Sequence, residues 1–122
     1  MQLSINTREK QGVVVLDVSG RIVAGEECDS LRNKIKELLT SNQKKIFLNL
    51  GEVARVDSTG IGILVEAVIN TVREGGHLKL VNVPRLIRSI LSTHRLLQAF
   101  EIYDNEEAAL VSLEKQTQEP AA

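Results

Sequence analysis

The residues best suited to chemistry are two adjacent hydroxyls in the middle of the chain, Ser58 and Thr59, within the run Asp-Ser-Thr-Gly-Ile-Gly at residues 57–62. They follow an apolar run typical of a strand and precede the longest amphipathic run of the sequence. The first N–H groups of a helix have no internal partners, and the helix dipole favours negative charge there. A hydroxyl at this point can cap the helix, or it can carry a phosphoryl group, because anions are stabilised at helix N-termini. Position alone favours the cap.

An enzymatic use of Ser58 has weaker support. A serine nucleophile needs a positioned base, and nothing in the spacing of His77 or His94 places either beside Ser58. The segment lacks the glycine that precedes the serine of a nucleophile elbow by two positions and the lysine of a Walker loop. Two histidines and the single cysteine, Cys28, are too dispersed for a metal-ligand spacing. We therefore expect a protein that is not an enzyme and needs no metal or cofactor.

Strands and helices are predicted to alternate around this segment. A hairpin with strands at residues 3–7 and 13–18 opens the chain, and a loop bounded by glycines follows at 20–25. Asp104, with Glu107 three residues later, resembles a capping box, and Pro84 suits the first position of a helix. Such alternation predicts an α/β fold with a mixed, mostly parallel sheet, one antiparallel edge and about four helices. The helices are predicted over residues 26–40, 59–74, from 84 onward and 104–114, and the later strands over 45–50, 77–83 and 101–103.

The helix after Ser58 has an apolar stripe that we expect to face the core. Ile63 then lies on the opposite side, flanked by the small residues Gly60 and Ala67. Either a partner protein contacts Ile63 or another segment of this chain covers it, and the sequence does not decide between them. The predicted core stripe consists of Ile61, Leu64, Val65, Val68, Ile69 and Val72.

Composition limits the function classes. The chain has 122 residues, 43% hydrophobic but only 2% aromatic, which predicts one domain with an aliphatic core. A formal net charge of -1 gives no basic field for nucleic acid. The single cysteine excludes an internal disulfide and fits a reducing compartment. No apolar run is long enough to span a bilayer, and the N-terminus has no signal pattern, so we expect a cytoplasmic protein without membrane insertion. The polar residues 116–122 are expected to be disordered.

Residues 57–62, preceded by the apolar strand at 46–50, resemble the STAS domain of bacterial anti-sigma factor antagonists. Those proteins carry Asp-Ser-(Ser/Thr)-Gly-(Leu/Ile)-Gly where a helix follows a hydrophobic strand. The similarity in length and element order covers about residues 3–113, which implies a STAS domain over residues 1–115. It also implies a regulator that binds an anti-sigma factor, itself a serine kinase, while unphosphorylated. By position, that kinase would phosphorylate Ser58, with Thr59 as a possible secondary acceptor, and a phosphatase would restore Ser58.

The resemblance further implies a partner-binding surface around the phosphoacceptor. A phosphoserine carries roughly -1.5 to -2 charges at neutral pH, so a docked partner would bury an unpaired dianion. Even ~3 kcal/mol of penalty would weaken binding about a hundredfold.

One departure from the family pattern is Val23, which stands where many relatives have an acidic residue that contacts the kinase. A STAS scaffold or transporter-associated subunit without a switch is the alternative function. The expected partner-binding residues are Arg21, Val23, Asp57, Ser58, Thr59, Gly60, Gly62 and Ile63.

Overall fold

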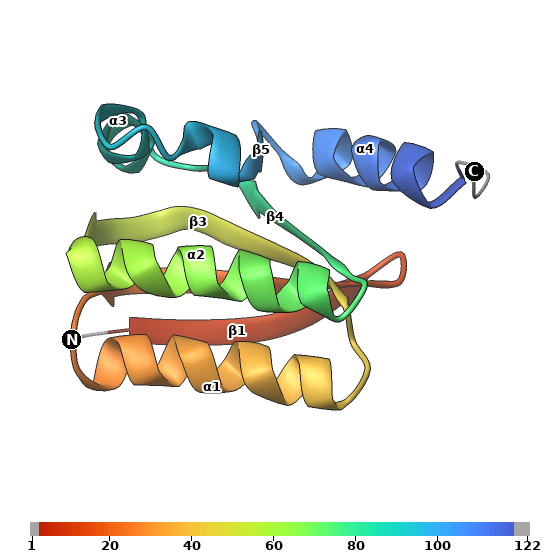
Figure 1. Ribbon diagram of the computed structural model, residues 1–122, viewed down its shortest axis with the longest axis horizontal. Coiled ribbons are helices and arrows are strands. Elements are labelled where there is room, and N and C mark those ends of the chain that lie inside the picture. The colour runs from red at the N-terminus through yellow and green to blue at the C-terminus, as the bar shows by residue number, and fades with distance from the viewer. Residues whose placement is uncertain (1–2, 119–122) are drawn as a thin grey trace.

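The computed structural model describes residues 3–118, and they form a five-stranded sheet with helices on both faces (Figure 1). The strands lie in the order β1-β2-β3-β4-β5. β1 pairs antiparallel with β2, and the other neighbours pair in parallel. The predicted fold class is confirmed. In chain order the elements are β1 (Leu3–Lys10), β2 (Val13–Ile22), α1 (Glu26–Thr40), β3 (Lys45–Val56), α2 (Ser58–Arg73), β4 (His77–Val81), α3 (Arg85–Thr93), a 3-10 turn η1 (Leu97–Ala99), β5 (Glu101–Tyr103) and α4 (Glu106–Gln118).

The core has two layers of aliphatic side chains, one on each face of the sheet. Alternate residues of β2 and β3, such as Leu16 and Leu48, pack with α1, α2 and α3. The residues between them, such as Val15 and Phe47, pack under α4. Because these strands are buried on both faces, their sequences read as nearly continuous hydrophobic runs. α1 and α2 lie side by side and run in the same direction, so both begin at the same edge of the sheet (Figure 1).

β2 and β3 are longer than predicted. Residues 20–22 of the predicted loop at 20–25 belong to β2, and β3 continues from its predicted end at residue 50 to Val56, which pairs with Ile22 at the shared end of the two strands. The pairing register shifts after Asp17 and again after Gly20, whose φ is 100°. Such bulges insert a residue without ending the strand, which is why a glycine inside this run does not end it. The extension brings the segment after β2 next to the start of α2.

The ends of the helices differ from prediction in small ways. α1 spans the predicted residues 26–40, and Pro84 lies just before α3 rather than within it. α4 is capped by Asn105, whose Oδ1 accepts a hydrogen bond from the Ala108 N–H at 2.8 Å, so the predicted cap at Asp104 was wrong. Residues 116–118 belong to α4, which corrects the predicted disorder for them, whereas residues 119–122 lie outside the described part of the chain.

α2 is rotated relative to the predicted orientation. Its buried residues include Gly60, Ala67 and Thr71, whereas Ile69 and Val72, expected in the core, are 48% and 60% exposed. The buried face therefore lies roughly 100°, one residue step, from the predicted stripe. Small residues on this face let the helix approach both the sheet and α1 closely. They are only weakly hydrophobic, so a prediction based on the positions of large apolar residues does not place them in the core. The true orientation leaves an aliphatic face of α2 in solvent.

Candidate functional site

The two hydroxyls lie at the exposed start of α2. Ser58 is the first residue of the helix, and both Ser58 and Thr59 are solvent-exposed. They follow β3 at the carboxyl end of the parallel strands, where binding sites of open α/β sheets are usually found. Within residues 3–118, neither hydroxyl has a hydrogen-bond partner. Both oxygens are therefore accessible from solvent.

Asp57, rather than Ser58 or Thr59, caps α2. Its backbone is extended, and its Oδ1 accepts a hydrogen bond from the Gly60 N–H at 2.8 Å. The cap expected from a hydroxyl is thus supplied by the carboxylate that precedes it, which is a common capping group. The carboxylate also takes the position at the helix N-terminus that a phosphoryl group would favour. A phosphate on Ser58 would therefore add its charge on the outside of the helix start, beside Asp57.

The second oxygen of Asp57 joins the helix start to the loop after β2. Asp57 Oδ2 accepts a hydrogen bond from the Ala24 N–H at 2.9 Å. The hydrogen bonds from Ala24 and Gly60 lower the pKa of Asp57 below its ordinary value, because they stabilise the charged carboxylate. The loop after β2 and the segment that carries Ser58 are thus held together by one ionised side chain.

Gly60 is needed for the packing of α2 against β2. A Cβ at this position would lie 2.1 Å from the backbone oxygen of Ile22 and 3.0 Å from Cγ1 of Val56. Because real Cβ atoms do not approach a backbone oxygen so closely, only glycine fits here. Gly60 is buried, so its expected place on a partner-binding surface is wrong. Its role is structural: by allowing α2 to pack closely on β2, it fixes the position of Ser58 at the start of the helix.

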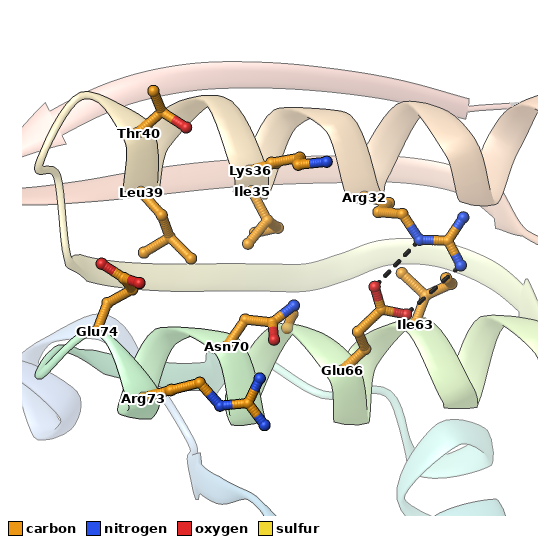
Figure 2. Close-up of a pocket in the computed structure, with 11 residues that line it drawn as sticks. Arg32, Ile35, Lys36, Leu39, Thr40, Ile63, Glu66, Asn70, Arg73 and Glu74 are labelled. Atoms are coloured by element: carbon orange, nitrogen blue, oxygen red, sulfur yellow. Dashed lines mark hydrogen bonds and ion pairs between the residues drawn. The ribbon is translucent and has the colours of Figure 1, made fainter.

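Ile63 is covered by the chain itself. It is 3% exposed and belongs to the main core. A groove of about 390 Å³ runs between α1 and α2, and Figure 2 shows Ile63 pointing into the space between them, next to the Arg32–Glu66 ion pair. Of the two interpretations left open by the sequence, coverage by another segment is confirmed. The prediction that Ile63 lies on an outward face and contacts a partner is wrong, because the buried face of α2 includes Ile63.

Arg21 and Val23 lie at the end of β2 and in the loop after it, and both are partly exposed. The Arg21 Nη2 atom lies 3.9 Å from Oε2 of the buried Glu27. Its Nε atom is buried and has no hydrogen-bond partner within residues 3–118. Both residues precede Ala24, which the carboxylate of Asp57 binds. The structure therefore brings this loop to the same edge of the sheet as Ser58.

The histidines do not lie at this site. His77 begins β4 and pairs with Lys45, the first residue of β3, whereas Ser58 follows the last residue of β3. Twelve residues of β3 span roughly 40 Å, so His77 is at the opposite edge of the sheet. His94 is an exposed residue at the C-cap of α3. Among residues 3–118 the side chains that could hold a metal ion do not cluster, and none of the helices there is long and apolar enough to cross a bilayer.

Comparison with known proteins gives the family. A protein called an anti-sigma F factor antagonist, from Paenibacillus polymyxa, is 28% identical over 115 residues, which cover 93% of this chain and 97% of that protein. The crystal structure of a putative anti-sigma factor antagonist from Thermotoga maritima superposes with a TM-score of 0.83 at 24% identity, covering 90% of this chain and 94% of the other.

The phosphorylated form of the Bacillus cell fate determinant SpoIIAA shares the fold, with a TM-score of 0.67 at 18% identity over 87% of this chain and 96% of its own. The STAS domain family matches residues 4–109. Since this match covers most of the sequence, including every strand and helix that positions Ser58, the chain belongs to the STAS domain family.

Proposed function

We propose that this protein is an anti-sigma factor antagonist whose partner is an anti-sigma factor with serine kinase activity. Unphosphorylated, it binds that partner; phosphorylation of Ser58 releases it, and a phosphatase restores it. The observation that carries the proposal is the state of Ser58: an exposed hydroxyl at the start of α2, left without a capping role because Asp57 caps the helix. Such a hydroxyl is accessible to a kinase without unfolding.

The surroundings of Ser58 suit control by charge. The adjacent Asp57 is ionised, since its pKa is lowered by hydrogen bonds from Ala24 and Gly60. A phosphate next to it would concentrate negative charge on a small surface, and burying that charge against a partner without a counter-ion is strongly unfavourable. Thr59 is also exposed, and it would serve as a secondary acceptor. Phosphorylation would then weaken docking while leaving the helix in place.

The proposed partner surface is formed by exposed or partly exposed residues around the hydroxyls. Arg21 and Val23 would contribute from the loop after β2, and Asp57, Thr59 and Gly62 from the start of α2. Val23 is half-buried and apolar, so it would contact an apolar part of the partner rather than a cation. The protein would act by binding in the cytoplasm, without catalysing a reaction and without nucleic acid.

The test combines the purified protein with purified anti-sigma factors of the serine kinase type. With ATP, mass spectrometry should find one phosphate on Ser58, and the Ser58→Ala variant should lose it. Without ATP hydrolysis, Ser58→Asp should bind the kinase at least tenfold more weakly than wild type. Ser92→Asp, an exposed serine on α3, is the matched control and should bind normally. If Ser58→Asp and Ser58→Ala both bind as tightly as wild type, the switch is wrong and a scaffold role is favoured.

A further inference from the structure

α3 presents arginines to solvent. Its buried residues, Ile87 and Leu91, hold one side of the helix in the core. The residues on the solvent side recur at intervals of three and four along the helix. We call this side, together with the exposed residue just after the helix, the basic face of α3: Arg85, Arg88, Ser89, Ser92 and Arg95. Figure 1 shows α3 at one corner of the molecule, well away from α1.

The positive charge of this face has little counter-charge in the described part of the chain. Residues 75–100 include no Asp or Glu, although the whole sequence has 16 acidic residues against 15 Lys and Arg. Within residues 3–118, Arg85 and Arg95 form no ion pair. The Arg88 Nη2 atom lies 3.8 Å from Oδ1 of Asp104, but the Asp104 side chain is 94% exposed, so solvent screens this pair. The face is therefore locally basic on a protein whose net charge is close to zero.

The stability of the helix does not account for these arginines. The first turn of a helix favours acidic side chains because of the helix dipole. The first turn of α3 instead begins with Arg85, contains no acid and has no side-chain cap. On α1, by contrast, Arg32 and Lys34 each pair with an acid three residues away on the same helix. Cations that oppose the dipole and lack partners on their own helix are expected where another molecule supplies the negative charge.

The size of the face and its neighbour Leu86 favour a lipid surface over an acidic protein. Leu86 follows Arg85 and is 61% exposed, the highest value among the exposed large hydrophobic side chains of residues 3–118. α3 has nine residues and rises about 13 Å, which is short for the roughly 800 Å² that each partner buries in a standard protein interface. A layer of headgroups needs no such matched surface. Guanidinium groups bind phosphate in a bidentate manner, and an aliphatic side chain beside them can enter the headgroup region.

We propose that α3 binds the surface of an anionic membrane through its basic face, without crossing the bilayer. Arg85, Arg88 and Arg95 contact lipid phosphates, and Leu86 enters the headgroup region. Binding is weak and sensitive to salt, because each arginine near an anionic surface contributes about a factor of five. The contact requires neither an anti-sigma factor nor a phosphate on Ser58, so it is independent of the proposed function.

Sedimentation of the protein with lipid vesicles tests the proposal. Vesicles of equal parts phosphatidylglycerol and phosphatidylcholine should bind it about a hundredfold more tightly than phosphatidylcholine alone, and high salt should remove the difference. The double variant Arg85→Gln, Arg88→Gln should bind the anionic vesicles about 25-fold more weakly than wild type. The matched control, Lys36→Gln with Arg73→Gln, removes two exposed cations from α1 and α2 and should bind as wild type. An equal loss in both double variants would reflect net charge alone and overturn the proposal.

A fluorescence readout shows which side of the protein touches lipid. The native Cys28 is 2% exposed, so a dye reacts mainly with a cysteine introduced at the surface. The emission of a polarity-sensitive dye on Leu86→Cys should shift to shorter wavelength on the anionic vesicles. The same dye on Val111→Cys, a 52% exposed position on α4, should not shift. Equal shifts at the two positions, or none at Leu86→Cys, would contradict the proposal.

Soluble anions separate a lipid surface from other sources of negative charge. Inorganic phosphate and polyglutamate, each at the same concentration of negative charge as the vesicles, should leave the wild-type protein bound to the vesicles. Displacement by phosphate would assign the basic face to a free anion, and displacement by polyglutamate alone would assign it to an acidic protein. Either result would overturn the proposal, as would wild-type protein that does not distinguish anionic from neutral vesicles.

Discussion

The carboxylate of Asp57 accepts hydrogen bonds from two separate segments, the Ala24 N–H at 2.9 Å and the Gly60 N–H at 2.8 Å, one on each oxygen. One bond caps α2, and the other fixes the loop between β2 and α1 against it. The residue beside the proposed phosphoacceptor thus determines how the two parts of the proposed docking surface lie relative to each other. It does so from a partly exposed position, before any partner is present.

Asp57→Asn should therefore destabilise the protein. The two N–H groups donate to different oxygens of Asp57, whereas an asparagine amide has only one oxygen. It can therefore replace the acceptor for Gly60 or for Ala24, but not both. We expect a loss of about 1–2 kcal/mol in the free energy of unfolding, the usual worth of a capping or charged hydrogen bond. Urea denaturation measures it, and hydrogen exchange at Ala24 should be faster. Asp104→Asn, at an exposed side chain just after β5, should change stability by less than about 0.5 kcal/mol. Equal effects of the two substitutions would contradict the role given to Asp57.

The two glycines of the motif should respond to alanine in opposite directions. Gly60→Ala places a Cβ within 2.1 Å of the Ile22 oxygen, so α2 must move away from β2. We expect a loss of about 3 kcal/mol or more, since the obstacle is backbone rather than a flexible side chain. Gly62→Ala meets open space in a helix and should stabilise the free protein by up to about 1 kcal/mol. Thermal unfolding of both variants checks this, and a destabilised Gly62→Ala would show that Gly62 has a structural role within the chain.

Features of the fold that depend on residues close in the sequence could be predicted from it, whereas features that depend on contacts between distant residues could not. The order of strands and helices was predictable because each parallel strand is a continuous apolar run and each helix has local start and stop signals. The orientation of α2 was not, because Gly60, Ala67 and Thr71 face the core where larger aliphatic residues were expected. Close packing of two helices on a sheet favours such small residues, and their low hydrophobicity hides them from a pattern of apolar positions.

Interactions between distant segments were missed for a related reason. The sequence pointed to a hydroxyl as the cap of α2 rather than to Asp57, and the bond of Asp57 to Ala24, 33 residues away, depends on the extension of β2 and β3 through a bulge. Lys79 gave no signal either. It lies in a strand whose other residues are mainly apolar, and only the fold shows that its side chain is fully buried. The sequence predicted which segment carries the proposed site, whereas the contacts that hold this segment are formed only in the folded protein.

The buried lysine offers a test of what holds α4 on the sheet. Lys79 Nζ donates to Glu101 Oε1 at 2.6 Å and to Gln116 Oε1 at 2.7 Å, and it lies 5.1 Å from the centre of the Tyr103 ring. Removing one partner of an ion pair is strongly destabilising when the charge left behind is buried, and here Lys79 is fully buried whereas the Glu101 side chain is 43% exposed. We expect Lys79→Met to keep or raise stability and Glu101→Leu to lower it by about 1–3 kcal/mol. Urea denaturation of the two variants compares them directly; a larger loss in Lys79→Met would reverse this interpretation.

Stability should fall in acid because of a cluster that joins β1, β2 and α4. Arg8 binds Asp17 at 2.6 Å and also Glu106. The Arg8 guanidinium lowers the pKa of Asp17 and of Glu106 below their ordinary values of 3.8 and 4.5. At a pH between the lowered pKa of the folded protein and the ordinary pKa of the unfolded chain, the unfolded chain binds more protons than the folded protein. Stability therefore rises with pH in that window. The stability that these ion pairs contribute is fully present above about pH 4.5 and is lost as the pH falls through the pKa values of the folded protein.

Arg8→Met should flatten this dependence. Urea denaturation at pH 6 and at pH 3 should show a smaller difference in free energy for Arg8→Met than for wild type. A remainder is expected, because the pKa values of Asp57, Glu101 and Glu107 are also lowered in the folded protein. Arg95→Met, at an exposed residue after α3, serves as the control and should keep the wild-type slope. A wild-type slope in Arg8→Met would mean that the acid sensitivity arises elsewhere.

Negative charge at Ser58 should leave the fold intact. An aspartate in the first turn of a helix interacts favourably with the dipole by about 0.3–1 kcal/mol, and repulsion from the neighbouring Asp57 opposes it by a similar amount. Ser58 is exposed, so no core contact changes. We therefore expect Ser58→Asp to unfold in urea within about 0.5 kcal/mol of wild type. A loss above about 2 kcal/mol would mean that weaker binding by this variant reflects unfolding. A loss near zero would assign the whole effect on binding to the charged surface, since the scaffold beneath Ser58, from Asp57 to Gly60, would be unchanged.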